Sequence, residues 1–163
     1  MQEILNMNSL MRQLLTQLVS GIDSAELYEQ VGESGNSPGW ILGHLSVVNQ
    51  LGVQMLGGTG PSAEAMQMFG PGSPGVPDPA TRPGKEFLLQ LEQSSAAQLR
   101  EAIEGAPEQA LNSPQPSQFL KERFPLVKDM LGHMLVSHLS LHVGQLSTWR
   151  RAKGMPSILQ FGK

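Results

Sequence analysis

Residues 131–149, LGHMLVSHLSLHVGQLSTW, carry polar side chains on a helix stripe that is otherwise apolar. Successive spacings of 4, 3, 4, 3 and 4 residues separate Leu131, Leu135, His138, His142, Gln145 and Trp149. This is the period of an amphipathic helix, so these six side chains are expected on one face, directed toward a core. Two imidazoles four residues apart on such a face can bind one divalent ion.

Apolar periodicity outward from this stretch predicts four long helices, at about 3–21, 38–56, 84–105 and 125–153. Ser37 gives the second helix an N-cap and Pro38 suits its first position. Gly154 ends the last helix. A short turn is expected at 25–30 and a short helix at 62–69. Because no segment shows a convincing strand pattern, the chain is predicted to be all-α, as an antiparallel four-helix bundle.

The connection between the second and third helices, residues 57–84, contains 7 Gly and 6 Pro. Antiparallel neighbours do not need so long a link, whereas two parallel helices do, because the chain must return along the bundle. The predicted topology is therefore up-down-down-up with a Gly/Pro-rich crossover between helices 2 and 3. The length of 163 residues favours one domain, 1–163.

Composition and charge exclude several classes of function. The chain has 11 Lys and Arg against 14 Asp and Glu, a net charge of −3, so it offers no basic surface for nucleic acid. Cysteine is absent, which removes thiolate metal ligands and a protein thiol nucleophile. The first residues lack the positive start of a signal peptide, and no apolar run reaches 18 residues. A cytoplasmic protein without a membrane partner is expected.

The second predicted helix supplies a third histidine. His44 shares a face with Ile41, Leu45, Val48 and Leu51, so it should also point inward. In antiparallel helices, His44 and His142 lie roughly 9 and 16 Å from matching ends, at nearly the same level. Three neutral imidazoles would form an open site with room for water or substrate. The alternative is that each is a core histidine satisfied by a hydrogen bond.

The fourth histidine is expected outside this site. His133 lies nine residues before His142, about half a turn away around the helix, and is assigned to the flank of the bundle. Residues 139–141 contain no glutamate, so the metalloprotease arrangement, with a general base between the histidines, is absent.

Two segments resemble motifs of the DinB-like superfamily. HLSLHVGQ at 138–145, followed by WRR at 149–151 and GMP at 154–156, is similar to the last helix of that family. WILGHL at 40–45 resembles its second-helix motif. The resemblance implies a four-helix bundle with His44, His138 and His142 as metal ligands and Gln145 behind them. Many members carry His and Arg where this chain has Leu141 and Val143, so its site should be more apolar.

The resemblance also implies a chemistry. Some DinB-like proteins are metal-dependent transferases that use low-molecular-weight thiols, and others are described as metal hydrolases. The hypothesis is an enzyme whose three-histidine divalent metal site activates water or a small thiol toward a small electrophile. Zinc or nickel is the first candidate, with iron or manganese next, and a homodimer is expected. The alternative is a non-catalytic binding or stress-response module with a structural metal or none.

Overall fold

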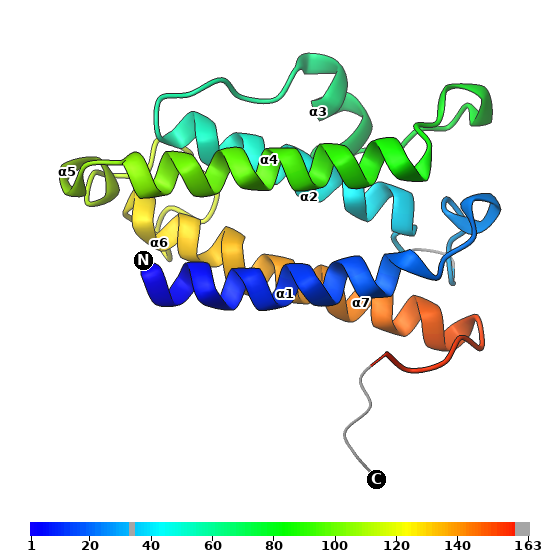
Figure 1. The fold of residues 1–163 in the computed structure, drawn as a ribbon. Coiled ribbons are helices and arrows are strands. Elements are labelled where there is room, and N and C mark those ends of the chain that lie inside the picture. Colours follow the sequence, from blue (N-terminus) through cyan, green and yellow to red (C-terminus); the bar gives the residue numbers. More distant parts are fainter. Residues whose placement is uncertain (33–34, 159–163) are drawn as a thin grey trace, which may run out of the picture.

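The computed structural model describes residues 1–32 and 35–158, and this part of the chain is helical (Figure 1). The α-helices are α1 (Gln2–Ser20), α2 (Pro38–Met55), α3 (Ala63–Phe69), α4 (Lys85–Gly105), α5 (Glu108–Leu111), α6 (Val127–Gly132) and α7 (Leu139–Ala152). Two short 3₁₀ helices are η1 (Ser24–Glu26) and η2 (Pro79–Thr81), and η3 (His133–His138) is π-helical. The described residues form no strand beyond one isolated bridge, so the predicted all-α class is confirmed.

The termini of the long helices follow from local sequence. The Ser37 hydroxyl accepts a hydrogen bond from the Trp40 backbone N–H at 3.3 Å, and Pro38 opens α2. Gly154 adopts a φ of 70° directly after α7, a conformation that glycine allows without strain.

The last long helix differs from the prediction. A single regular helix was expected over 125–153, but α6, η3 and α7 follow one another, with the π-helical turn between two α-helical segments. The short helix α5 was not predicted. The apolar periodicity of the sequence cannot reveal a π-helical turn, because such a turn changes which residues share a helix face without ending the helix.

Contacts between residues of α2 and α4 show the relative direction of the two helices. Asn49 Nδ2 donates to Ser95 Oγ at 3.1 Å, and Gly52 lies against Leu99. Both residue numbers rise together, so the two helices run parallel, side by side, as Figure 1 shows. Residues 56–84, which include α3, connect the end of α2 to the start of α4 and carry the chain back along the bundle.

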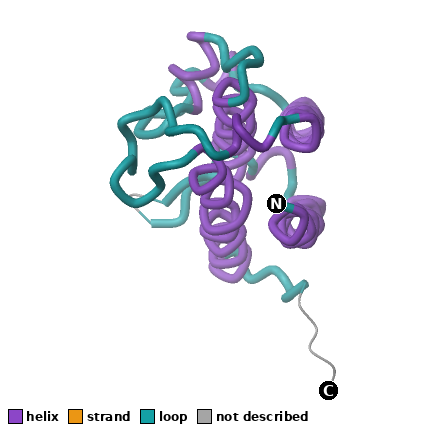
Figure 2. The backbone as a smooth tube through the Cα atoms, turned by 90° about the vertical axis from the view of Figure 1, so that its left-hand side faces the viewer, coloured by secondary structure: helices purple, strands orange, loops and turns teal. Residues whose placement is uncertain are grey.

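The first and last helices form a second parallel pair. Asn8 Nδ2 donates to the Leu135 carbonyl at 2.8 Å, and Arg150 Nη1 donates to the Leu18 carbonyl at 2.9 Å. The two pairs run in opposite directions, because Ser9 contacts Arg100 while Arg12 contacts Glu92. Figure 2 looks along the helices and shows most loops on one side of them.

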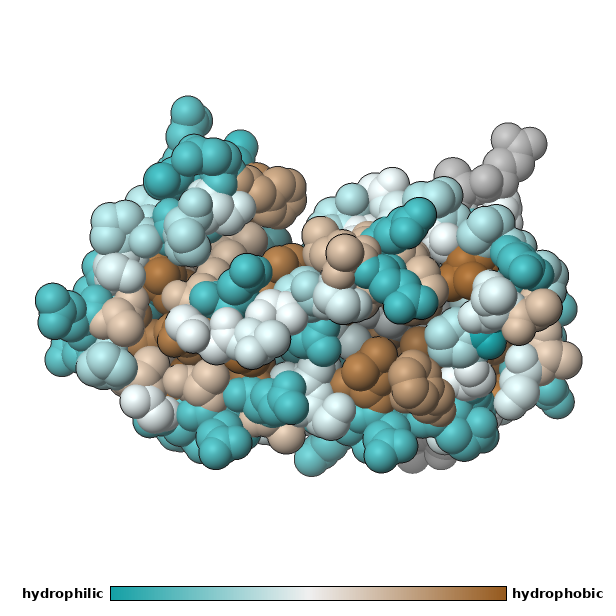
Figure 3. All heavy atoms as spheres, turned by 90° about the horizontal axis from the view of Figure 1, so that it is seen from above, coloured by the Kyte–Doolittle hydropathy of each residue, from teal (hydrophilic) through white to brown (hydrophobic). Residues whose placement is uncertain are grey.

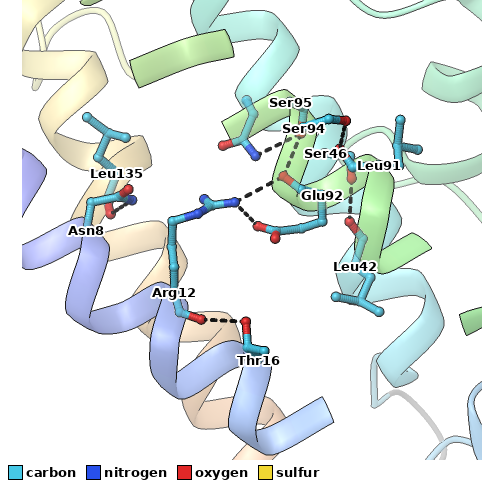
Figure 4. Close-up of polar contacts among 11 residues, drawn as sticks. Asn8, Arg12, Thr16, Leu42, Ser46, Leu91, Glu92, Ser94, Ser95 and Leu135 are labelled. Atoms are coloured by element: carbon cyan, nitrogen blue, oxygen red, sulfur yellow. Dashed lines mark hydrogen bonds and ion pairs between the residues drawn. The ribbon is translucent and has the colours of Figure 1, made fainter. Parts of the chain in front are cut away.

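A buried ion pair joins α1 to α4. The Arg12 guanidinium contacts the Glu92 carboxylate and also donates to the Glu92 carbonyl at 3.1 Å (Figure 4). Ser95 Oγ donates to the same carbonyl at 3.0 Å and accepts from Asn49. The buried polar atoms of this region therefore have partners, as burial requires.

The apolar core consists of two clusters. One includes Leu42 and Leu139, and the other includes Val48 and Leu135. His44 lies in the chain between Leu42 and Val48, so it sits where the two clusters meet. On the outside, Figure 3 shows a mostly polar surface with separate apolar groups and a hollow in its upper edge. Among the described residues, no helix is both long and apolar enough to span a bilayer.

Candidate functional site

The structure brings together three of the four histidines. His44 comes from α2, His138 ends η3 and His142 lies on α7. One ring nitrogen of each lies within 4.8 Å of the other two. The Nε2 atom of His138 is 3.2 Å from Nε2 of His44 and 3.2 Å from Nε2 of His142. The Nε2 atoms of three imidazoles therefore face one point between α2 and the last helix.

Hydrogen bonds at Nδ1, on the side away from the converging Nε2 atoms, orient two of these rings. His44 Nδ1–H donates to the Phe69 carbonyl at 2.8 Å, and His142 Nδ1–H donates to Gln145 Oε1 at 2.9 Å. With the proton on Nδ1, the lone pair of each Nε2 points toward the centre of the group. Asn36 Nδ2 also donates to Gln145 Oε1, at 3.2 Å, which fixes the orientation of that amide.

Hydrogen bonding within the group cannot satisfy all three Nε2 atoms. His138 can donate one Nε2 proton to either His44 or His142, and the Nε2 lone pair of the other ring is then left without a proton donor. Two nitrogens on a tetrahedral zinc ion with bonds of about 2.0 Å lie about 3.3 Å apart, close to the observed 3.2 Å. The buried His138 Nδ1 has no hydrogen-bond partner. The donor set fits a divalent cation.

Burial holds the three imidazoles neutral. It lowers the pKa of His138 to about 3, with His142, His44 and His133 as further causes. Burial, and then the proximity of His44, lowers the pKa of His142 to about 4, while the hydrogen bond to Gln145 acts in the opposite direction. The pKa of His44 is lowered by burial as well. At neutral pH all three rings can act as ligands, because a metal binds the unprotonated nitrogen.

The neighbourhood of His44 depends on a glycine. A Cβ atom on Gly43 would lie 2.4 Å from the Phe69 ring, so only glycine lets the end of α3 approach α2 this closely. That approach places the Phe69 carbonyl at His44. On the other side, the Trp40 ring stacks on His44 with centroids 4.5 Å apart, and Trp40 Nε1–H donates to Ser73 Oγ at 3.0 Å.

His133 was expected on the flank of the bundle, outside the metal site. His133 is not among the three converging histidines, but its ring centroid lies 6.0 Å from that of His138, and both line one pocket. In a regular α-helix, residues five apart lie about 140° apart around the axis. The π-helical turn from His133 to His138 forms its hydrogen bonds over five residues, so it brings the two rings toward the same face.

The site opens onto a cavity of about 750 Å³, which His44 and His138 line together with His133. Within the described residues, no carboxylate and no fourth histidine joins the converging group. A site with three protein nitrogens beside a cavity has the open form of catalytic metal centres, in which exogenous molecules complete the coordination.

A family profile described as the DinB superfamily matches residues 8–146. The chain belongs to the DinB superfamily. All three converging histidines and Gln145 lie within the range matched by the DinB profile. The comparisons with curated proteins and with solved structures gave no match.

Sequence reasoning missed the backbone partner of His44 and the place of His133. The Phe69 carbonyl comes from a connection whose path periodicity does not predict, although Gly43 beside His44 signals a close approach there. Gln145 was identified from the DinB-like motif, and the structure places its amide oxygen at His142.

Proposed function

We propose that His44, His138 and His142 bind one divalent metal ion and that the protein is a metal-dependent enzyme acting on a small electrophile. The observation that supports this most directly is the convergence of three Nε2 atoms, two of them 3.2 Å from the third. Neutral imidazole nitrogens suit zinc and nickel, and also iron. Manganese is retained as a further candidate.

The nucleophile in this proposal comes from outside the protein. The chain has no cysteine, and among the described residues no carboxylate joins the histidines as a general base. A divalent ion, when bound, lowers the pKa of a coordinated water or thiol and so supplies the nucleophile without a protein base. Water would give a hydrolase, and a low-molecular-weight thiol would give an S-transferase.

The residues behind the ligands have distinct roles. The Phe69 carbonyl and the Gln145 amide hold the Nδ1 protons of His44 and His142, which keeps each Nε2 free. Trp40 covers one face of His44 and excludes water from that side. Burial lowers the pKa of each ligand ring, so protons do not compete for the nitrogens near pH 7.

Metal content tests the site. Protein purified without chelators or an affinity tag should contain about one divalent ion per chain by elemental analysis. His138→Ala should lose most of this metal, because one of three ligands is removed. His133→Phe is the matched control, since it alters a nearby histidine outside the converging group and should keep the metal. Equal metal content in both variants would refute the assignment of the ligands.

Turnover tests the chemistry. Consumption of a panel of small electrophiles would be followed with several low-molecular-weight thiols and with buffer alone. Activity should require metal and should be lost in His138→Ala. Turnover that persists after metal removal would contradict the proposal. A fully metallated protein that is inactive across the panel would instead favour a non-catalytic DinB-like binding or stress-response module.

A further inference from the structure

The cavity beside the histidines has walls from several parts of the fold. Helix α2 contributes Val48, Leu51 and Met55, while α3 contributes Met66. Met130 and Met134 come from α6 and η3, and Pro116 and Phe119 come from the loop before α6. The volume of about 750 Å³ lies in the range of small-molecule pockets. We call this cavity the methionine pocket.

Hydrogen bonds of a buried side chain stabilise the wall formed by the loop before α6. Gln115 is buried, and its Nε2 donates to the Phe119 carbonyl at 3.1 Å and to the Phe124 carbonyl at 2.8 Å. Its backbone N–H also bonds to the Pro125 carbonyl. The loop is thus folded around one amide side chain, and this wall of the pocket is formed before any ligand arrives.

Among the described residues, the lining carries no Asp, Glu, Lys or Arg side chain. Along these walls an ion would give up its water without a countercharge, which is costly, because the metal ion of the proposed function would lie only at the histidine end, whereas an apolar molecule gains by leaving water. Four methionines line the pocket, and their flexible thioether chains adapt to ligands of irregular shape. This lining therefore selects against charged molecules and in favour of apolar ones.

The polar side chains of the lining are His44, His133 and His138 at one end, together with Gln54 and with Ser117, whose Oγ already accepts from the Phe119 backbone N–H at 3.0 Å. His133 stacks on Phe124 with centroids 4.7 Å apart, and within the described part of the chain its ring nitrogens have no hydrogen-bond partner. The same end of the pocket is bounded by His44 and His138. A ligand in this pocket would find mainly apolar walls along its length and a cluster of imidazole nitrogens at the end near the metal ligands.

We infer that the methionine pocket binds an uncharged, mainly apolar small molecule, oriented with its polar group toward His133 and the three converging histidines. The inference deepens the proposed function and rests on it, because it names the class of the electrophile. It makes the ligand's apolar body the main source of affinity and its polar end the part presented for reaction.

Two matched fluorescent probes test the charge preference. N-phenyl-1-naphthylamine is uncharged, and 1-anilinonaphthalene-8-sulfonate has the same ring system with an added sulfonate. Titrated into the protein, the uncharged probe should bind at least tenfold more tightly than the anionic one. Equal or stronger binding of the sulfonate would overturn the inference.

Variants locate the binding. Met66→Glu adds a charge to the lining at a half-exposed position of α3, so it should fold and should weaken the uncharged probe at least tenfold. Met66→Leu should keep binding within about twofold. Met7→Glu makes the same change at an exposed methionine of α1 outside the pocket and is the control. Unchanged binding to Met66→Glu would place the probe elsewhere and refute the inference.

The two proposals fail separately. Probe binding is measured on metal-loaded and chelator-treated protein, and on the variant with all three converging histidines changed to alanine. Selective probe binding without metal or turnover would overturn the proposed enzyme and keep the apolar pocket. Metal-dependent turnover with no preference for the uncharged probe would overturn the pocket inference alone.

Discussion

Gly43 leaves the space that the Phe69 ring occupies beside His44, although it contributes no side chain. Phe69 is buried beside it, at 2% exposure, and cannot move without disturbing the core. The carbonyl that receives the His44 proton belongs to this same Phe69. The absence of a side chain at Gly43 therefore determines how the imidazole ring of the next residue, His44, is oriented.

Gly43→Ala should disturb both packing and metal binding. The added Cβ would lie 2.4 Å from the Phe69 ring, and crowding of this kind costs about 1–3 kcal/mol of unfolding free energy. Displacement of the Phe69 carbonyl should also weaken metal binding, because His44 loses its orienting partner. Denaturant unfolding and a metal titration would measure the two effects.

The control for this change is Gly144→Ala on α7. No atom lies within 4 Å of a Cβ built there, and Gly144 is exposed. Alanine in a helix interior is favoured over glycine by about 0.5–1 kcal/mol, so this variant should gain stability. A Gly43→Ala protein as stable as Gly144→Ala would contradict the crowding argument.

Among the helical elements, η3 departs most from regular geometry and carries two of the four histidines. At its end the Leu139 N–H bonds to the Val136 carbonyl. Asn8 of α1 donates its side-chain amide to the Leu135 carbonyl at 2.8 Å (Figure 4). A side chain from a different helix thus binds the backbone of the π-helical turn directly.

Asn8→Ala should destabilise the protein by about 1–3 kcal/mol, because it removes a buried hydrogen bond to the Leu135 carbonyl. Because the π-turn brings His133 and His138 to one face, the variant should also bind metal more weakly. Asn6→Ala is the matched control two residues away, where the side chain is exposed and accepts only from Gln2, and its effect should stay within about 0.5 kcal/mol. Thermal or denaturant unfolding compares them, and equal losses would contradict this role.

For the whole molecule, burial of three neutral imidazoles makes stability depend on pH. The folded pKa values of His138 and His142, about 3 and about 4, lie below the value of about 6.5 for an unfolded histidine. As the pH falls below about 6.5, the unfolded chain binds protons that the folded chain refuses. Stability is therefore highest above that pH and decreases as the solution is acidified toward the folded pKa values.

Metal-free protein should lose stability between about pH 6.5 and pH 5, with a slope of up to about 1.4 kcal/mol per pH unit for each histidine that stays neutral. Urea unfolding at several pH values in the presence of a chelator would measure this slope. Replacing all three converging histidines with leucine should flatten it. A slope that survives in the leucine variant would assign the effect to other groups.

Much of this molecule follows from its sequence because the signals are local. The predicted bounds of α1, α2 and α4 agree with the structure to within about one residue, since apolar period, caps and glycines lie in the helices themselves. The histidines on the inward stripes were found for the same reason. The π-turn, the Phe69 carbonyl and the pocket depend on contacts between distant segments, such as Asn8 with Leu135, that no periodicity encodes.

The parallel pairing of the helices has a mechanical consequence. Helix α4 packs on α2, and α1 packs on α7, so the bundle consists of two halves. His44 belongs to one half, and His138 and His142 belong to the other. An ion bound as proposed would cross-link the two helix pairs. Removal of the metal with a chelator should then speed amide hydrogen exchange in both helix pairs along the surface where they meet, well beyond the ligands themselves.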